Sequence, residues 1–259
     1  MTPETNDAVR TWHDGHVAFV EIHRPPNNFF DRQTLSTLAD QLEALGSDGQ
    51  TRAVVLCSDG KHFCAGADLT GGAPVDDVRG AAAALYGHAL RIFAQPLPMV
   101  AAVQGSAIGG GMGLALAADF RVVDVSSRFA ANFSRLGFHQ GFGLSVSLPR
   151  VVGVQHAADL LLSGRSVQGD EALAMGLCDQ LADPGDQRSV ATELAGRLAE
   201  AGPLAVRSIR ATLRHGLVAQ IEAAIEHELD EQVSLMATSD WREGIRASRD
   251  RRPPQFTGQ

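Results

Sequence analysis

Small residues that follow apolar runs are the parts of this sequence best suited to do chemistry. Gly109, Gly110 and Gly111 come shortly after the apolar run 99–103 and open an apolar segment of helical length. The first N–H groups of a helix have no partner within the helix, and the helix dipole adds partial positive charge there. Because glycine has no side chain, another molecule can approach this backbone closely. The stretch 104–119 is therefore predicted to bind an oxygen that carries or develops negative charge.

The same glycine turn does not match the common nucleotide-binding patterns. No G-x-G-x-x-G can be drawn through residues 105–113, and Lys61, the only lysine, is followed by His62 instead of the Ser or Thr of a phosphate loop. A second loop of small residues, 65–67, follows the apolar run 52–57, and Asp68 is placed to cap the segment after it. The two loops together are a more specific signal than either loop alone.

Composition and charge exclude several classes of protein. The 259 residues are 44% hydrophobic and 20% charged, as in globular proteins, and the net charge of −8 argues against a nucleic-acid partner. Cys57, Cys64 and Cys178 fit neither a disulfide framework nor a zinc knuckle, and no H-x-x-x-H pair occurs, so no metal site is predicted. No secretory leader and no membrane-spanning segment is recognised, so we expect no membrane partner and a cytoplasmic location.

Apolar periodicity predicts the elements that position these loops. Strands are expected at 17–22, 52–57, 99–103, 119–124, 128–132 and 177–181, and helices at 35–46, 81–93, 144–152, 156–162 and 169–176. Residues 1–15 are polar and are expected to be loose at the very end of the chain. From residue 186 onward the pattern is helical almost throughout. This order indicates a layered α/β core at 1–200 and a helical region at 201–259.

FCAGADL at 63–69, together with QGSAIGGGMGLALAAD at 104–119, resembles the crotonase superfamily, the enoyl-CoA hydratase/isomerase family. RPPNNFF at 24–30, LPRVVG at 148–153 and EGIRASRDRRPPQF at 243–256 extend the resemblance over essentially the whole chain. The resemblance implies an α/β, crotonase-like (ClpP/crotonase) spiral of ββα units with a helical C-terminal trimerisation region. It also implies a homotrimer or a dimer of trimers. The substrate would be an acyl-CoA thioester, with coenzyme A as part of the substrate and no permanently bound cofactor.

Carried over residue by residue, the resemblance assigns an oxyanion hole to the backbone N–H groups of Ala65 and Gly110. Such donors would stabilise the enolate-like oxygen that a thioester develops when it reacts at its α- or β-carbon. The adenine part of coenzyme A would lie along residues 65–69, which include Ala67, Asp68 and Leu69. Lys61 and the basic tail, 249–252, are candidates to meet its phosphates, although solvated surface is the plainer explanation for the tail.

The carboxylates of the family's hydratases are missing from this chain. The positions that match the two glutamates hold Gly113 and Phe133, and the position of a later isomerase carboxylate holds Gly141. Hydration needs a base for the water and an acid for the α-carbon, and these residues supply neither. His139 and Gln140 are expected to face the acyl group, with His139 as a candidate proton shuttle. The losses predict an apolar pocket around Phe133 and a bulky or aromatic acyl group.

The motifs are compatible with two functions and do not support a third. The first is an enzyme that stabilises a thioester enolate, with weak hydration of crotonyl-CoA. The second is a catalytically silent acyl-CoA-binding protein, which would keep the loops and lose the acid and base. A serine hydrolase finds no support, because no G-x-S-x-G occurs and Ser145 and Ser147 have no evident base. Tyr86, the only tyrosine, is expected to belong to the core or to a lid.

Overall fold

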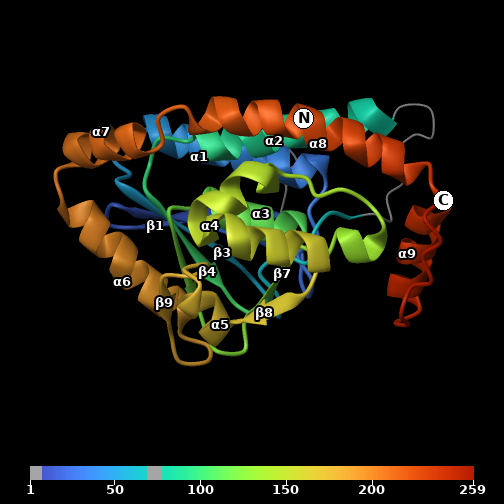
Figure 1. The fold of residues 1–259 in the computed structure, drawn as a ribbon. Coiled ribbons are helices and arrows are strands. Elements are labelled where there is room, and N and C mark those ends of the chain that lie inside the picture. Colours follow the sequence, from blue (N-terminus) through green and yellow to red (C-terminus); the bar gives the residue numbers. More distant parts are fainter. Residues whose placement is uncertain (1–7, 69–77) are drawn as a thin grey trace, which may run out of the picture.

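The computed structural model of the chain describes residues 8–68 and 78–259, so Leu69 lies outside the described part. Strands and helices alternate up to α6, and helices make up the rest (Figure 1). The strands are β1 (Val9–Asp14), β2 (Val17–Ile22), β3 (Ala53–Ser58), β4 (Met99–Val103), β5 (Ser106–Ile108), β6 (Phe120–Val123), β7 (Arg128–Ala130), β8 (Ser166–Gln168) and β9 (Gln180–Leu181). The helices are α1 (Arg32–Ser47), α2 (Val78–Ala94), α3 (Gly110–Ala117), η1 (Ser134–Leu136), α4 (Leu144–Ser163), α5 (Gly169–Ala174), α6 (Gln187–Glu200), α7 (Pro203–Leu213), α8 (Leu217–Met236) and α9 (Ser239–Arg249).

The main sheet has the strand order β1-β2-β3-β4-β6-β9 and is parallel except for the β1–β2 pair. Its central strands β2, β3 and β4 are buried throughout, which explains why their sequences are predominantly apolar. Side chains alternate along a strand, so Val20 faces one core and Phe19 faces the other. Helix α6 covers the Phe19 face, while α1, α2, α3 and α8 contribute to the larger core on the Val20 face.

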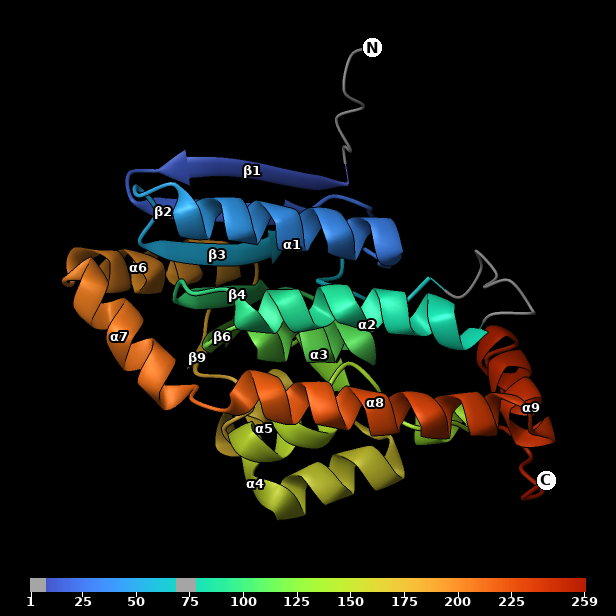
Figure 2. The same ribbon diagram turned by 90° about the horizontal axis from the view of Figure 1, so that it is seen from above.

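Helix α8 belongs to the main core. Leu217, Ile221, Ile225 and Leu229, at helical spacing, are buried in the same cluster as the sheet and α1. Figure 2 shows α1, α2 and α8 running side by side. The boundary expected near residue 200 falls between α6 and α7. Because α8 packs into the main core, the helices after this boundary do not form a core of their own. An oligomerisation role for them remains a prediction.

A smaller sheet positions the glycine turn. Its order is β5-β7-β8, with β5 parallel to β7 and β8 antiparallel to it. Strand β5 ends at Ile108, Gly109 follows with a φ of 55°, and α3 begins at Gly110. The positive φ at Gly109 lets the chain turn directly from the strand into the helix.

The structure also corrects three expectations about local structure. Val9–Asp14, in the polar segment 1–15, forms the edge strand β1, for which no strand was predicted. The short strands β5 and β8 were not predicted. The two helices expected at 144–162 adjoin at Gly153, whose φ of 78° and ψ of 161° interrupt the helical conformation. Within the two described ranges, no helix has both the length and the apolar content needed to cross a membrane.

Candidate active site

The two loops of small residues lie against each other. The Cys64 N–H donates to the Ser106 carbonyl at 3.0 Å, and the Ile108 N–H donates to the Cys64 carbonyl at 3.0 Å. These bonds lay the 63–65 segment beside β5 as a bridge between Cys64 and Ala107. A Cβ on Gly111 would overlap the Cys64 carbonyl, so only glycine fits there. Main-chain contacts therefore set the spacing between the two turns.

The N–H groups of the first loop are used differently from what the sequence suggests. The Ala65 N–H donates to the Asn27 carbonyl at 2.9 Å and so is already engaged. This hydrogen bond conflicts with the assignment of Ala65 as an oxyanion donor, because an engaged N–H is not free to receive a substrate oxygen. The Ala67 N–H donates to no acceptor in the described ranges, although Gly66 and Asp68 on either side of it both pair with Phe30.

The second loop offers a donor from the start of α3. Gly110 is the first residue of this helix, so its N–H lies outside the helical hydrogen-bond ladder and meets no acceptor among the described residues. The Phe30 and Phe142 rings lie against Gly110, because a Cβ there would approach their carbons to 2.5 and 3.4 Å. Gly110 also lines the cavity that these rings help to form.

Both turns line one cavity of about 410 Å³. Residues 65–68 come from the first turn, and Gly109 and Gly110 come from the second. Aromatic rings make up much of the remaining wall, namely those of Phe30, Phe133, Phe138 and Phe142. The cavity is mostly apolar and has a few polar side chains, which is the usual composition of a small-molecule site.

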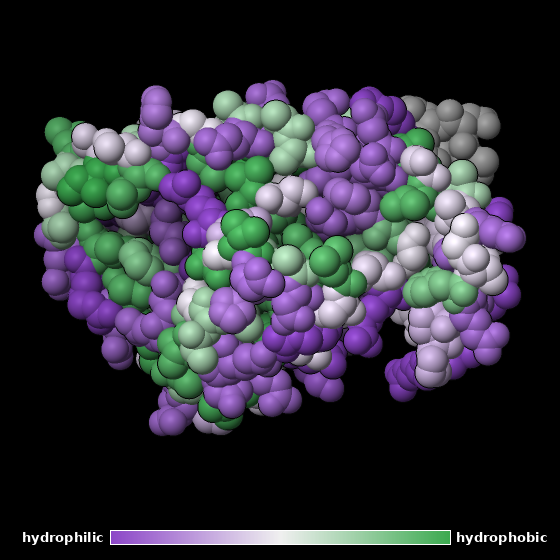
Figure 3. Space-filling view, in the orientation of Figure 1, coloured by the Kyte–Doolittle hydropathy of each residue, from purple (hydrophilic) through white to green (hydrophobic). Residues whose placement is uncertain are grey.

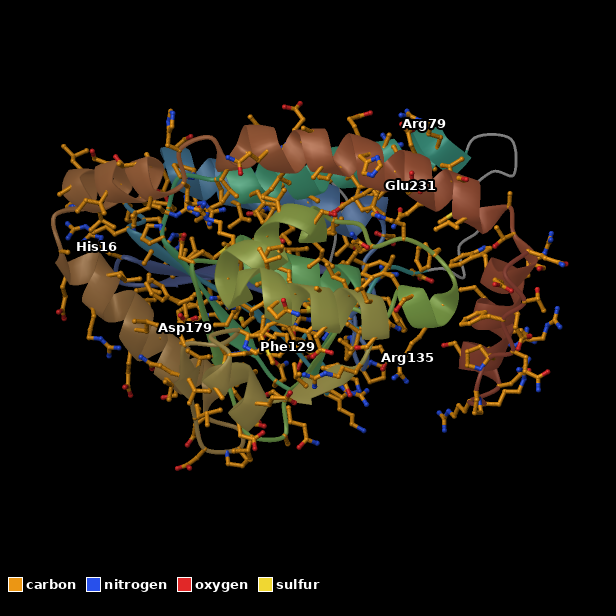
Figure 4. All side chains as sticks on the ribbon, in the orientation of Figure 1. His16, Arg79, Phe129, Arg135, Asp179 and Glu231 are labelled. Carbon is orange, nitrogen blue, oxygen red and sulfur yellow. The ribbon has the colours of Figure 1, made fainter. Side chains whose placement is uncertain are left out.

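Helices α2 and α8 supply another wall of this cavity. Leu85 and Tyr86 line it from α2, and Gln232 and Met236 line it from α8. Figure 4 shows Arg79, near the start of α2, next to α8, where its guanidinium pairs with Asp230 at 2.9 Å and Glu226 at 3.3 Å. These partners are exposed, so the pairs contribute little to stability.

Some predicted residues lie away from the cavity. Lys61 is exposed, and neither His139 nor Gln140 is among the residues that line the cavity. The His139 Nδ1 is 2.9 Å from the Gln140 carbonyl, and the His139 ring packs edge-on to His227 of α8 at 5.9 Å. In the basic tail, Arg252 pairs with Glu243. Ala67, Asp68, Phe133 and Gly110 do line the cavity.

Apolar or structural groups surround residues 113, 133 and 141, the positions that the resemblance matches to carboxylates of the family. Phe142 is fully buried, and its ring packs against Gly113 at the first position. At the second position, the Phe133 ring packs at a tilt of 58° against Phe138, with a centroid distance of 5.3 Å. At the third, a Cβ on Gly141 would overlap the Tyr86 hydroxyl.

Tyr86 is the buried polar group nearest to that third position. Its hydroxyl donates to the Gln232 Oε1 at 2.8 Å, and the Gln232 Nε2 donates to the His139 carbonyl at 3.0 Å. Burial raises the pKa of Tyr86 far above its ordinary value, so the phenol stays protonated at neutral pH. The sequence assigned Tyr86 to the core or a lid, and it is in fact both buried and in the cavity wall.

Sequence reasoning missed Glu228, which fixes the loop behind the cavity. This fully buried carboxylate accepts the N–H of Gly143 and of Ser145, each at 2.8 Å, at the start of α4. Burial raises its pKa, while these N–H groups and the charge of His139 act in the opposite direction. A charged residue three positions after Ile225, on the apolar face of α8, was the signal that could have identified it.

Comparison with known proteins identifies the class of protein to which this fold and cavity belong. The sequence profile of the enoyl-CoA hydratase/isomerase family matches residues 13–259. A Thermus thermophilus protein provisionally named an enoyl-CoA hydratase is 37% identical over 250 residues, which cover 93% of this chain and 98% of the relative. The crotonyl-CoA hydratase of Syntrophomonas wolfei is 32% identical over 247 residues, covering 93% and 94%.

Solved structures agree with the sequence matches. The enoyl-CoA hydratase/isomerase from Pseudoalteromonas atlantica T6c superposes with a TM-score of 0.85 at 28% identity, covering 96% of this chain and all of that one. The fold is therefore of the crotonase type, as expected. The chain belongs to the enoyl-CoA hydratase/isomerase family.

Proposed function

We propose that this protein is an enzyme that binds an acyl-CoA thioester and stabilises its enolate with the N–H groups of Ala67 and Gly110. The observation that carries this proposal is the position of both donors. They belong to two turns that are hydrogen bonded to each other, they line one cavity, and neither meets an acceptor among the described residues. An oxygen held between them would gain stabilisation as it becomes charged, and one such donor contributes about 3–4 kcal/mol to a transition state.

The proposed chemistry does not include efficient hydration. Gly113, Phe133 and Gly141 supply no carboxylate to hold or activate water. Relatives carry the names of crotonyl-CoA and enoyl-CoA hydratases, but those names describe the relatives. We expect this chain to hydrate crotonyl-CoA slowly or not at all, and to turn over a thioester whose acyl group fits an aromatic-walled cavity.

Binding of a matched ligand pair tests the oxyanion hole. Butyryl-CoA carries the thioester carbonyl, and S-butyl-CoA has a methylene in its place. We expect isothermal calorimetry to give tighter binding of butyryl-CoA by about tenfold or more, because only its oxygen meets the two donors. Equal affinities would contradict the proposed hole. A panel of acyl- and enoyl-CoA thioesters, followed by mass spectrometry, then identifies the reaction.

A second candidate function is a catalytically silent acyl-CoA-binding protein. The observation that favours it is the set of titratable groups in the described part of the cavity wall. Asp68 pairs with Arg24 at 3.6 Å and the phenol of Tyr86 stays protonated, which leaves no free carboxylate or imidazole there. Binding without turnover across the panel supports the silent function, whereas conversion of any thioester rules it out.

The assembly proposed for the protein is a homotrimer or a dimer of trimers in the cytoplasm, with no permanently bound cofactor. Large apolar side chains are exposed on α4 and α7, namely Val154, Leu162, Leu204, Ile209 and Leu213. Hydrophobic surface gathers over α7 in Figure 3. Exposed apolar patches of this kind mark interfaces. Light scattering after gel filtration tests the assembly, and a mass of one 27.4 kDa chain would contradict it.

A further inference from the structure

One polar side chain in the described wall of the cavity has no hydrogen-bond partner among the described residues. Four polar side chains line the described wall, namely Asp68, Tyr86, Asn132 and Gln232. Tyr86 and Gln232 bond to each other, and Asp68 pairs with Arg24. The carboxamide of Asn132 forms no hydrogen bond with any residue in the described ranges, so it remains available to a ligand.

Asn132 is held next to the glycine turn. It follows β7, and the Gly109 N–H donates to the Ala130 carbonyl at 2.8 Å, which ties the end of β7 to the turn. The Asn132 Oδ1 is 3.5 Å from the place where a Cβ on Gly109 would lie. The carboxamide therefore lies beside Gly109, the residue that precedes Gly110. In the sequence, Asn132 directly precedes Phe133.

An aliphatic acyl chain would bury this carboxamide without a partner. Leaving a buried polar group unpaired lowers affinity, and a site built to pair with a substrate oxygen rejects the analogue that lacks it. The thioester carbonyl does not supply this partner, because its oxygen has two lone pairs and the Ala67 and Gly110 donors use both. Pairing of Asn132 thus requires a second oxygen on the acyl group.

We propose that Asn132 is a specificity-determining residue, and that the substrates are acyl-CoA thioesters with an oxygen on C3, as in 3-oxoacyl and 3-hydroxyacyl groups. This inference rests on the proposed oxyanion hole. C2 becomes part of the enolate, and C3 is the nearest carbon beyond it that can carry the second oxygen. A carboxamide suits both forms, because its NH₂ donates to a ketone and its carbonyl accepts from a hydroxyl.

Three four-carbon thioesters separate the alternatives. Calorimetry with acetoacetyl-CoA, 3-hydroxybutyryl-CoA and butyryl-CoA is expected to give affinities about tenfold higher for the two oxygenated ligands. Asn132→Leu, which keeps the branched shape of the side chain, should abolish this preference by weakening the oxygenated ligands relative to butyryl-CoA, which no longer buries an unpaired carboxamide. Gln220→Leu removes a carboxamide at an exposed position near the start of α8. This variant serves as the control and should keep the preference for the oxygenated ligands.

Asn132→Asp provides a second variant that keeps the side-chain shape. A carboxylate accepts hydrogen bonds but does not donate them, so this variant should lose the preference for acetoacetyl-CoA and retain that for 3-hydroxybutyryl-CoA. Equal affinities of the wild type for all three ligands would overturn the inference while leaving the oxyanion hole intact. Equal losses for all three in Asn132→Leu would also overturn it. If the wild type binds none of them, the proposed function fails as well.

Discussion

The ring of Phe142 occupies the space into which a side chain at residue 113 would extend. A Cβ on Gly113 would lie 2.7 Å from the Cδ1 of Phe142 and 2.9 Å from its Cβ. Phe142 reaches this place with a φ of 63°, a backbone conformation that a phenylalanine rarely adopts. Because the Phe142 ring fills this space, replacing Gly113 alone would not place a carboxylate there.

Gly113→Glu should destabilise the protein, because the new side chain would overlap a fully buried ring. We expect a loss of about 1–3 kcal/mol in the free energy of unfolding, measured with urea. Phe142→Ala alone should cost about 3–5 kcal/mol through the cavity it leaves. The double variant should lose less than the sum of both, since each change makes room for the other. Strict additivity would show that the two positions are independent.

His139→Ala should leave the affinity for butyryl-CoA and any thioester turnover within about twofold of the wild type. The imidazole bonds to its own loop and packs on His227, and it is absent from the cavity wall. Phe133→Ala, a change in that wall, is the comparison variant and should alter binding. A loss of turnover by tenfold or more in His139→Ala would mean that this side chain reaches the substrate.

Asp119→Asn should lower the free energy of unfolding by about 3 kcal/mol. The Asp119 carboxylate accepts from the Arg210 Nε at 2.8 Å and the Arg214 Nη1 at 3.1 Å, and it also accepts the Met99 N–H. Both guanidinium groups are largely buried, so loss of the negative charge leaves two cations without their partner. Asp183→Asn, at an exposed position, is the control and should change stability by less than about 0.5 kcal/mol.

Glu228 predicts a pH dependence of stability. Burial raises the pKa of this carboxyl above its usual 4.5 in the folded state. The folded protein therefore binds this proton more tightly than the unfolded chain does. The free energy of unfolding falls as the pH rises from the pKa of Glu228 in the unfolded chain to its higher pKa in the folded state. Glu228→Gln removes the titration. Urea denaturation from pH ~4 to ~8 should show the stability of the wild type, relative to the variant, decreasing with pH. An increase would mean that the N–H groups of Gly143 and Ser145 outweigh burial.

The apolar runs of the sequence predicted the central sheet well, and the exceptions have physical reasons. Strands β2, β3 and β4 are buried on both faces and are therefore predominantly apolar. Strand β1 is an edge strand whose side chains after Val9 are mostly exposed, so its residues are polar and show no such run. Strands β5 and β8 have three residues each, too few to establish a period.

The candidate site was harder to predict because partners distant in the sequence decide which atoms are free. The choice between the Ala65 and Ala67 N–H groups depends on the Asn27 carbonyl. The exclusion of His139 from the cavity wall and the pairing of Tyr86 both involve α8. No local motif in the sequence carries this information.

The hydrogen bonds that join Cys64 to Ser106 and Ile108 involve only main-chain atoms. Their geometry does not depend on which side chains surround the acyl group. Residues of the cavity wall such as Phe133 can therefore be exchanged while the main-chain frame that receives the ligand stays the same. Point mutations in the cavity wall can therefore produce new reactions on this frame while every variant along the way keeps the fold.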